Sequence, residues 1–277
     1  MEQHGNNHRQ FVFAVIPARY ASTRLPGKLL LEIGGLPLIF HTINQTLKAR
    51  TVDELIVATD DENLCRMVRE NCTEACLTSP DHQSGSDRIA EVAEKLLPEG
   101  AIVVNVQGDE PLISPATIDA AVEALLADET ADIATTCERI EEARDVLSPD
   151  VVKVVTDAQG FALYFSRSPV PFPRDAVKKY GSLEKALDTE PELIDLFRKH
   201  TGLYVYRREY LLRFTKMAQT PLEKCELLEQ LRALENGARI RVVETVDRSI
   251  GVDTREDFER VRAIIEKSDV GCRTSDV

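Results

Sequence analysis

Three basic side chains, Arg19, Arg24 and Lys28, lie within ten residues of a chain whose net charge is -13. Hydroxyl side chains and Gly27 stand between them, so backbone amides and hydroxyls could approach an anion closely. The segment directly follows an apolar run, and ligands of an open parallel sheet bind beyond the carboxyl ends of its strands. This pattern predicts a phosphate-binding loop in preference to a solvated basic loop. It is neither a Walker A loop nor a dinucleotide fingerprint, because Leu29 follows Lys28 and the upstream glycine is missing.

Two aspartates could hold a divalent cation beside that loop. Asp109 follows the apolar run 101–106, within the segment QGDEP, and Asp253 directly precedes Thr254. Mg²⁺ takes oxygen ligands, typically one or two carboxylates together with substrate phosphates. Each aspartate also has a structural alternative, which is a plain turn for Asp109 and stabilisation of a helix dipole for Asp253. Sequence spacing does not decide between these alternatives.

Two further features are weaker. The segment DHQSGSDR, residues 81–88, could present backbone amides to a base or a carboxylate. Its spacing alone favours an ordinary N-capped helix start. His200 follows Arg198 and Lys199 beside a predicted strand, where a lone histidine is more often structural than catalytic.

Composition restricts the class of protein. Acidic residues outnumber basic ones 47 to 34, which argues against a general duplex-binding protein and predicts no nucleic-acid partner. No apolar stretch approaches the ~20 residues that span a bilayer, and the polar residues 1–10 do not resemble a signal peptide. The six cysteines form no CxxC pair, so neither a zinc ribbon nor a thioredoxin site is indicated. We expect a cytoplasmic protein with reduced cysteines and no membrane insertion.

Strand and helix patterns alternate in the first half of the chain. We expect helices from Pro37, over 61–70 and 87–97, and from an N-cap at Ser114 that is followed by proline. We expect strands over 11–16, 55–59, 74–78 and 101–106. This alternation indicates βαβ units and a parallel sheet. Because the strands are continuously apolar, both faces of the sheet should be covered.

The pattern changes after about residue 135. Segments 151–156 and 161–165 flank a turn and predict a hairpin. Residues 168–179 hold three prolines and predict a loop. We further expect a strand over 202–206, a helix over 222–234, a strand over 240–246 and a last helix from Thr254, which has capping-box spacing to Asp257. We therefore expect one domain over 11–267, a lobe inserted at about 135–215, and polar tails over 1–10 and 268–277.

Seven segments together are recognisable. In chain order, the sequence resembles the 3-deoxy-manno-octulosonate (Kdo) cytidylyltransferases in IPARYASTRLPGK, DHQSGSDR, VNVQGDEP, ALYFSR, HTGLYVY, LLEQLR and GVDT. The resemblance runs from about Phe11 to Ile265. It implies a three-layer, Rossmann-like nucleotidyltransferase domain with a mainly parallel sheet and a smaller antiparallel lobe. It also implies a homodimer that transfers CMP from CTP to Kdo, with Mg²⁺, releasing pyrophosphate and making CMP-Kdo for lipopolysaccharide biosynthesis.

The resemblance also implies roles for single residues. Lys28, Arg19, Asp109 and Asp253 correspond to catalytic groups, and the two aspartates to magnesium ligands. The positions that would bind CTP are Pro17, Ala18, Arg19, Lys28, Ser84, Gly85 and Asp87. The positions that would bind the sugar acid are Arg88, Gln107, Arg167, His200, Tyr204, Glu229 and Gln230. An anionic sugar acid needs cations, which Arg88, Arg167 and His200 could supply.

Other functions stay open at this point. The same scaffold could serve another sugar acid, such as sialic acid or an amino-substituted octulosonate. A metal-dependent glycosyltransferase or a non-catalytic nucleotide-binding protein are further alternatives. No general base is evident, and a metal-coordinated sugar hydroxyl would lose its proton more easily without one.

Overall fold

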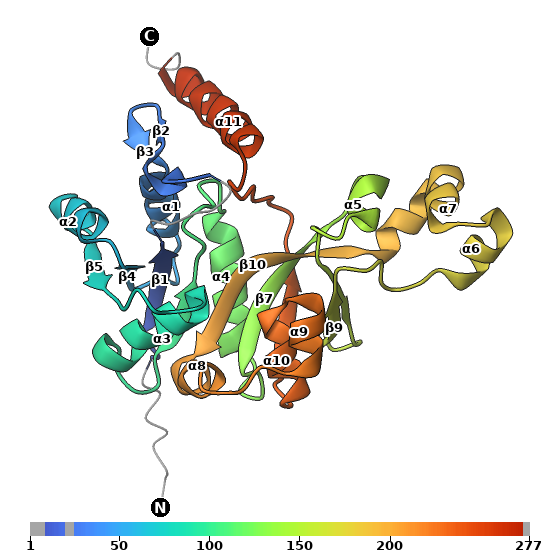
Figure 1. The fold of residues 1–277 in the computed structure, drawn as a ribbon, viewed down its shortest axis with the longest axis horizontal. Coiled ribbons are helices and arrows are strands. Elements are labelled where there is room, and N and C mark those ends of the chain that lie inside the picture. The colour runs from blue at the N-terminus through green and yellow to red at the C-terminus, as the bar shows by residue number, and fades with distance from the viewer. Residues whose placement is uncertain (1–8, 20–24, 274–277) are drawn as a thin grey trace, which may run out of the picture.

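The computed structural model describes residues 9–19 and 25–273, and their side chains as far as residue 267. Its centre is a nine-stranded sheet with the main order β11-β7-β10-β6-β1-β4-β5 (Figure 1). Four neighbouring strands are mutually parallel, as predicted: β6 (Ile102–Asn105), β1 (Val12–Ala18), β4 (Glu54–Thr59) and β5 (Glu74–Leu77).

One long strand runs against the others. β10 (Arg198–Arg207) is antiparallel to β6 on one side and to β7 (Ile133–Arg139) on the other. β11 (Ile240–Glu244) is parallel to β7. Two reversals restore the original direction, so β7 and β11 point the same way as β1 and β6. The carboxyl ends of these four strands and the beginning of β10 therefore share one edge of the sheet.

Helices cover both faces of the sheet. One face packs on α1 (Leu38–Thr46), α2 (Glu62–Glu70), α4 (Pro115–Leu126) and α11 (Arg255–Arg273). The other packs on α3 (Gly85–Leu96), α8 (Arg208–Phe214) and α10 (Glu229–Glu235). Strand β1 contributes alternate side chains to the two cores, with Ala14 and Ile16 in the first and Phe13 and Val15 in the second. The three-layer α/β prediction is confirmed.

The middle of the chain forms the antiparallel part and an arm. The predicted hairpin is present as β8 (Lys153–Thr156) and β9 (Ala162–Ser166). The arm extends to the right in Figure 1, away from the hairpin. It consists of α5 (Ala143–Leu147), α6 (Arg174–Tyr180), α7 (Leu183–Thr189) and the 3-10 helix η2 (Pro191–Leu196). A small separate core of Ile140, Val146, Leu187 and Phe197 holds this arm together.

Two predicted elements are wrong. Residues 168–179 were expected to be a loop, but α6 begins at Arg174, directly after the last of the three prolines. None of its residues is buried, so it has no apolar periodicity that the sequence could show. The helix expected over 222–234 is two helices, α9 (Pro221–Glu226) and α10. Leu227 separates them in a left-handed conformation with φ 54°, which an α-helix does not accommodate.

The ends of several elements also differ from expectation. The last helix does start after a capping pair, because Thr254 and Asp257 bond reciprocally. It continues to Arg273, so the tail expected from residue 268 is helical over most of its length. A short hairpin, β2 (Glu32–Ile33) and β3 (Leu36–Pro37), and the 3-10 helix η1 (Lys28–Leu30) were not foreseen. No helix among the described residues is long and apolar enough to cross a membrane.

Candidate active site

Three side chains from distant parts of the chain meet at the shared edge of the sheet. Lys28 starts η1 after β1, Asp109 follows β6, and Asp253 follows β11. The Lys28 ammonium lies 2.5 Å from Asp109 Oδ2 and 2.9 Å from Asp253 Oδ1. Lys28 and the two carboxylates thus form one cluster, which is consistent with the shared direction of β1, β6 and β11.

Backbone contacts hold the two aspartate loops together. The amide of Val252 donates to the carbonyl of Asp109 at 2.8 Å. The 107–110 turn also packs tightly on β1, since a Cβ at Gly108 would lie 3.2 Å from the carbonyl oxygen of Pro17. The close approach explains why glycine precedes Asp109. This packing fixes the position of Asp109 relative to the carboxyl end of β1.

The electrostatics of the cluster favour cations. Burial alone lowers the pKa of the Lys28 ammonium, but Asp109 and Asp253 outweigh burial and raise the pKa above its ordinary value. Lys28 therefore stays protonated between two carboxylates.

Among the described residues no group of three or more histidine, cysteine or acidic side chains could hold a metal ion. A donor set of two carboxylates suits Mg²⁺, which completes its octahedron with water and substrate phosphates.

The start of α3 lies against the end of β1. A Cβ at Gly85 would lie 3.5 Å from Pro17 Cγ, and the Arg19 guanidinium donates to the carbonyl of His82 at 3.0 Å. Ser84 and Asp87 form a reciprocal capping box, which is the plain helix start that their spacing favoured. Their roles in CTP binding, like those of Pro17 and Ala18 in β1, stay predictions. Arg24 lies outside the described residues.

Five of the seven predicted sugar-acid positions lie at or beside this edge: Gln107, His200, Tyr204, Glu229 and Gln230. Gln107 donates to the side chain of Asn105 and to the carbonyl of Gly202, which places it between β6 and β10. Glu229 accepts from the Ser86 hydroxyl at 2.7 Å, so α10 touches the first turn of α3. Gln230 is buried and Tyr204 is half-buried. Burial raises the pKa of the Tyr204 phenol well above its ordinary value, so Tyr204 is neutral.

The structure gives different environments to the three groups expected to supply cations. Burial lowers the pKa of the His200 imidazole to about 3, so His200 is neutral and the expectation of a cation there is wrong. Arg88 is fully buried and donates to Asp60 at 2.7 Å and to the hydroxyl of Thr78 at 2.5 Å. Its guanidinium is an internal counter-ion to Asp60.

Arg167 is also engaged within the protein. Its guanidinium donates to the backbone carbonyls of Glu226 at 2.7 Å, Pro149 at 3.0 Å and Leu227 at 3.5 Å. The side chain thereby ties the hairpin to the left-handed residue between α9 and α10. Its part in sugar binding stays a prediction.

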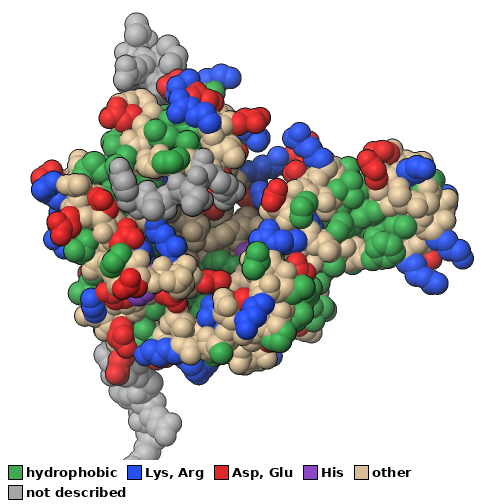
Figure 2. Space-filling view, in the orientation of Figure 1, with side chains coloured by type: hydrophobic (Ala, Val, Ile, Leu, Met, Phe, Trp, Pro, Cys, Tyr) green, Lys and Arg blue, Asp and Glu red, His purple; other side chains and the backbone are tan. Residues whose placement is uncertain are grey.

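A cavity of about 600 Å³ adjoins the site between α3, α8, α9 and α10. Figure 2 shows the same face of the molecule hollowed near its centre. Six of its lining residues belong to the motifs DHQSGSDR and LLEQLR: Gln83, Ser84, Asp87, Leu227, Glu229 and Arg232. The other four lie outside the quoted motifs: Thr215, Gln219, Glu223 and Lys224.

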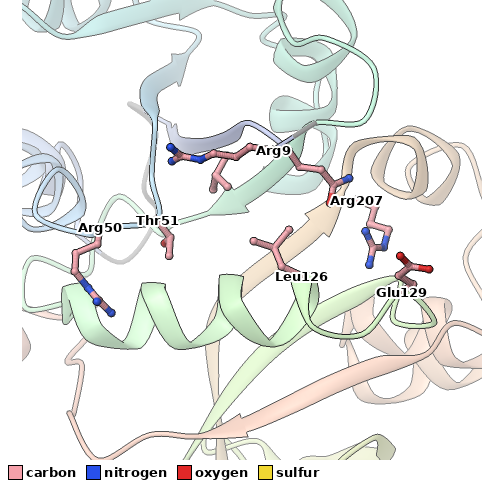
Figure 3. Close-up of a pocket in the computed structure, with 8 residues that line it drawn as sticks. Arg9, Arg50, Thr51, Leu126, Glu129 and Arg207 are labelled. Carbon is pink, nitrogen blue, oxygen red and sulfur yellow. The ribbon is translucent and has the colours of Figure 1, made fainter. Parts of the chain in front are cut away.

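A second cavity, of about 920 Å³, lies at the opposite edge of the sheet, beside Val12 at the start of β1 (Figure 3). Its arginines already have partners. Arg9 pairs with an aspartate at 2.6 Å, Arg50 pairs with another at 3.1 Å, and Arg207 donates to three backbone carbonyls. Arg50 contacts a second carboxylate as well, that of Glu123 at 3.5 Å. This cavity lies away from the carboxyl ends of the parallel strands, where ligands of such sheets bind, and none of the predicted site residues lines it.

Two residues at this edge of the sheet, Glu110 and Gly202, were given no binding role by the sequence patterns. Burial, together with Asp109, raises the pKa of the Glu110 carboxyl to about 7. A Cβ at Gly202 would lie 3.4 Å from both Gln107 and Glu110, and the pairing register of β10 shifts between His200 and Tyr204. A glycine inside a strand pattern is the signal that could have indicated this close approach.

Comparison with known proteins agrees with this geometry. A family model described as cytidylyltransferase matches residues 13–240. The chain is similar to the 3-deoxy-manno-octulosonate cytidylyltransferase of Geobacter sulfurreducens, with 53% identity over 90% of this chain and 97% of that protein. It is similarly related to the protein of the same name from Geobacter metallireducens, with 54% identity over 90% of this chain and 96% of that protein.

Solved structures give the same result. The chain is similar to CMP:2-keto-3-deoxy-manno-octonic acid synthetase complexed with CTP, with a TM-score of 0.83 and 38% identity over 94% of this chain and 100% of that chain. It also shares its fold with 4-diphosphocytidyl-2C-methyl-D-erythritol synthase of Anaerococcus prevotii, at 13% identity and a TM-score of 0.59 over 93% of this chain and 99% of that chain. The second likeness concerns the fold alone.

Proposed function

The chain belongs to the 3-deoxy-manno-octulosonate cytidylyltransferases, and from that premise we propose that it transfers CMP from CTP to Kdo and releases pyrophosphate. The observation that carries this proposal is the meeting of Lys28, Asp109 and Asp253 at one edge of the sheet. A cation and two carboxylates at the carboxyl ends of parallel strands are suited to a nucleoside triphosphate with its metal ion.

In the proposed reaction the anomeric hydroxyl of Kdo attacks the α-phosphorus of CTP. A bond forms between that oxygen and the α-phosphorus, and the bond from the α-phosphorus to the oxygen that bridges it to the β-phosphorus breaks. The hydroxyl proton passes to solvent water, and pyrophosphate leaves with the bridging oxygen and its negative charge. Transfers of this kind depend mainly on positioning and on stabilisation of charge. Lys28, held protonated by its neighbours, and Arg19 would stabilise the charge that develops on the triphosphate.

Asp109 and Asp253 would hold Mg²⁺ together with the phosphates. When bound, the ion supplies neutralisation of phosphate charge and makes a coordinated hydroxyl easier to deprotonate. Lys28 lies between the two carboxylates, so its ammonium keeps them close and limits their mutual repulsion before substrates bind.

The sugar acid would lie beside Gln107, Glu229 and Gln230, on the side of the edge where β10 begins. Glu229 bonds to Ser86 in the first turn of α3, so the proposed sugar and cytidine sites share a direct contact. We further propose that the product serves lipopolysaccharide biosynthesis and that the enzyme works in the cytoplasm, where CTP is made.

We also propose that the protein is a homodimer that pairs through its arm. The proposal follows from the resemblance to the family. Phe172 and Leu196 are 61% and 50% exposed on the arm, so pairing there would cover both side chains. Light scattering of the purified protein should give twice the chain mass, and Phe172→Asp should shift the protein to monomer. A monomeric wild-type protein would contradict the proposal.

The decisive assay measures pyrophosphate from CTP, Kdo and MgCl₂, with mass spectrometry of the sugar product. We expect CMP-Kdo and pyrophosphate in equal amounts, and neither when CTP, Kdo or the metal is omitted. Sialic acid and an amino-substituted octulosonate in place of Kdo, and UTP in place of CTP, serve as competitors. A higher kcat/KM with another sugar acid, or no product with Kdo, would overturn the assignment.

A further inference from the structure

His200 lies at the start of β10, at the same edge of the sheet as the proposed sugar site. Its imidazole is held on two sides, by Phe165 with ring centres 4.9 Å apart and by Tyr204 at 5.3 Å. The ring is buried, and burial lowers its pKa to about 3. A neutral imidazole carries its proton on only one of two nitrogens, and which one decides what the ring can bind.

The hydrogen bonds of Thr135 assign that proton. The Thr135 hydroxyl oxygen lies 2.7 Å from the carbonyl oxygen of Leu203 and 2.9 Å from His200 Nε2. A hydroxyl has one proton, and a carbonyl can only accept. Thr135 therefore donates to Leu203 and accepts from His200, which places the imidazole proton on Nε2. The opposite tautomer would leave two acceptors facing each other within the strand pair, at the cost of an unmade buried bond.

The other ring nitrogen is then an acceptor without a partner in the part of the chain that the structure describes. No hydrogen bond joins His200 Nδ1 to any described residue, and Nδ1 is not among the enclosed polar atoms that lack a partner. Nδ1 therefore keeps part of its surface accessible, although the residue as a whole is only 9% exposed. A neutral nitrogen lone pair accepts from a hydroxyl and repels a carboxylate, so the group it suits on a sugar acid is a hydroxyl.

We propose that Thr135 is a positioning residue which fixes His200 in the Nε2-protonated tautomer, so that Nδ1 accepts a hydrogen bond from a hydroxyl of the sugar substrate. This inference rests on the proposed function, because it needs a polyhydroxy sugar at the edge. It gives His200 a role in selecting a sugar with a hydroxyl at that place, and leaves the carboxylate of the sugar to other groups.

The tautomer is measured first, without substrate and without a variant. In the wild-type protein labelled with ¹⁵N-histidine, the His200 Nδ1 resonance should lie in the range of an unprotonated ring nitrogen and Nε2 in that of a protonated one. Thr135→Val removes the acceptor at nearly constant shape, so it should mix the two tautomers, and Thr135→Ser should restore the wild-type pattern. A wild-type His200 protonated at Nδ1 would overturn the inference.

Steady-state kinetics then test the link to the sugar. Thr135→Val should raise the KM for Kdo about five- to tenfold, the value of one hydrogen bond, and leave the KM for CTP unchanged. The matched control is Thr136→Val, whose buried hydroxyl bonds to Thr201 instead of His200. Thr135→Ser should behave as wild type, which separates the bond from the packing.

The outcomes distinguish a failure of the proposed function from a failure of the role proposed for Thr135. A wild-type protein that makes no CMP-Kdo refutes the proposed function and with it the sugar part of the inference. An active wild type whose Thr135→Val variant keeps the wild-type KM for Kdo refutes the inference alone. Equal rises in the KM for CTP and for Kdo would show a structural role for Thr135 and also overturn it.

Discussion

The Lys28 ammonium lies 2.9 Å from the Asp253 carboxylate, although 225 positions separate the two residues along the chain. The contact depends on the direction of β11, because a strand pointing the other way would place Asp253 at the far edge of the sheet. That direction follows from one antiparallel strand, β10, between two groups of parallel strands. Because β10 is antiparallel, the loop after β11 lies at the same edge of the sheet as the loop after β1, and Asp253 can contact Lys28 there.

The two aspartates should be needed for turnover and for the effect of metal on stability. Asp109→Asn and Asp253→Asn should each lower kcat about 100-fold or more, because each removes negative charge placed for a cation beside the triphosphate. Pyrophosphate release at several Mg²⁺ concentrations measures the loss. MgCl₂ with CTP should raise the melting temperature of the wild type more than that of either variant.

Glu256→Gln is the matched control, since Glu256 is an exposed carboxylate on the same segment as Asp253. It should keep the activity and the metal response of the wild type. Near-normal magnesium-dependent turnover in both aspartate variants would contradict the assignment of these carboxylates.

The parallel half of the fold was predictable because β1, β4 and β6 are continuous apolar runs between helical segments. The direction of β10 was not, because strand pairing is set by contacts distant in sequence. The break between α9 and α10 was equally hidden, since the apolar period continues across Leu227 and only its φ of 54° ends the first helix. Hydrophobic patterns in the sequence therefore predict the strands and helices that bury an apolar face, but not their pairing directions or their interruptions.

The sequence indicated which residues lie at the site, but it did not indicate which of them are charged or already engaged in ion pairs. Lys28 and Asp109 could be placed because each follows a strand that the sequence shows clearly. The charge of His200 and the engagement of Arg88 could not, since they depend on Phe165 and Asp60, which no spacing connects to them. Burial and partners decide whether a cation-forming side chain is free, and both are properties of the folded chain.

His200 should make stability depend on pH on the acid side. Its folded pKa of about 3 lies below the ordinary value of 6.5, so the unfolded chain binds a proton more tightly. The contribution to stability is complete above pH 6.5 and is lost as the pH falls toward 3. Between pH 7 and pH 4 the loss amounts to about 3 kcal/mol. Urea unfolding of the wild type and of His200→Gln at several pH values measures the difference in slope.

The His200→Gln protein should lose less stability than the wild type over that range, whatever its stability at pH 7. Equal slopes for wild type and His200→Gln would show that His200 is protonated in the folded protein, against its burial beside Phe165 and Tyr204.

Arg88 should act on stability more than on sugar binding. Arg88→Gln removes a fully buried guanidinium and leaves the half-buried Asp60 carboxylate without its partner, so the free energy of unfolding should fall by about 2–4 kcal/mol. The Arg88→Gln/Asp60→Asn double variant should regain part of that loss, because the unpaired charge is removed as well. A KM for Kdo near the wild-type value in the double variant would support an internal role. A large rise in that KM with little loss of stability would instead place Arg88 in the sugar site.

Gly108 should tolerate no side chain, since its position sets the distance between Asp109 and Lys28. A Cβ there would lie 3.2 Å from the Pro17 carbonyl oxygen and 3.3 Å from a methyl group of Ile16. The backbone of β1 cannot yield, so Gly108→Ala should shift the 107–110 turn outward and cost about 1–3 kcal/mol of stability. Because positioning carries much of the catalysis, kcat should fall about 100-fold.

Gly251→Ala is the matched control, for nothing lies within 4 Å of a Cβ at that position. It stands in the segment that leads to Asp253, so it tests whether any added methyl group near the cluster is harmful. It should leave stability and kcat near their wild-type values. If Gly108→Ala behaved in the same way, the turn would be able to move without separating Asp109 from Lys28, and tight packing on β1 would not be what positions the carboxylate.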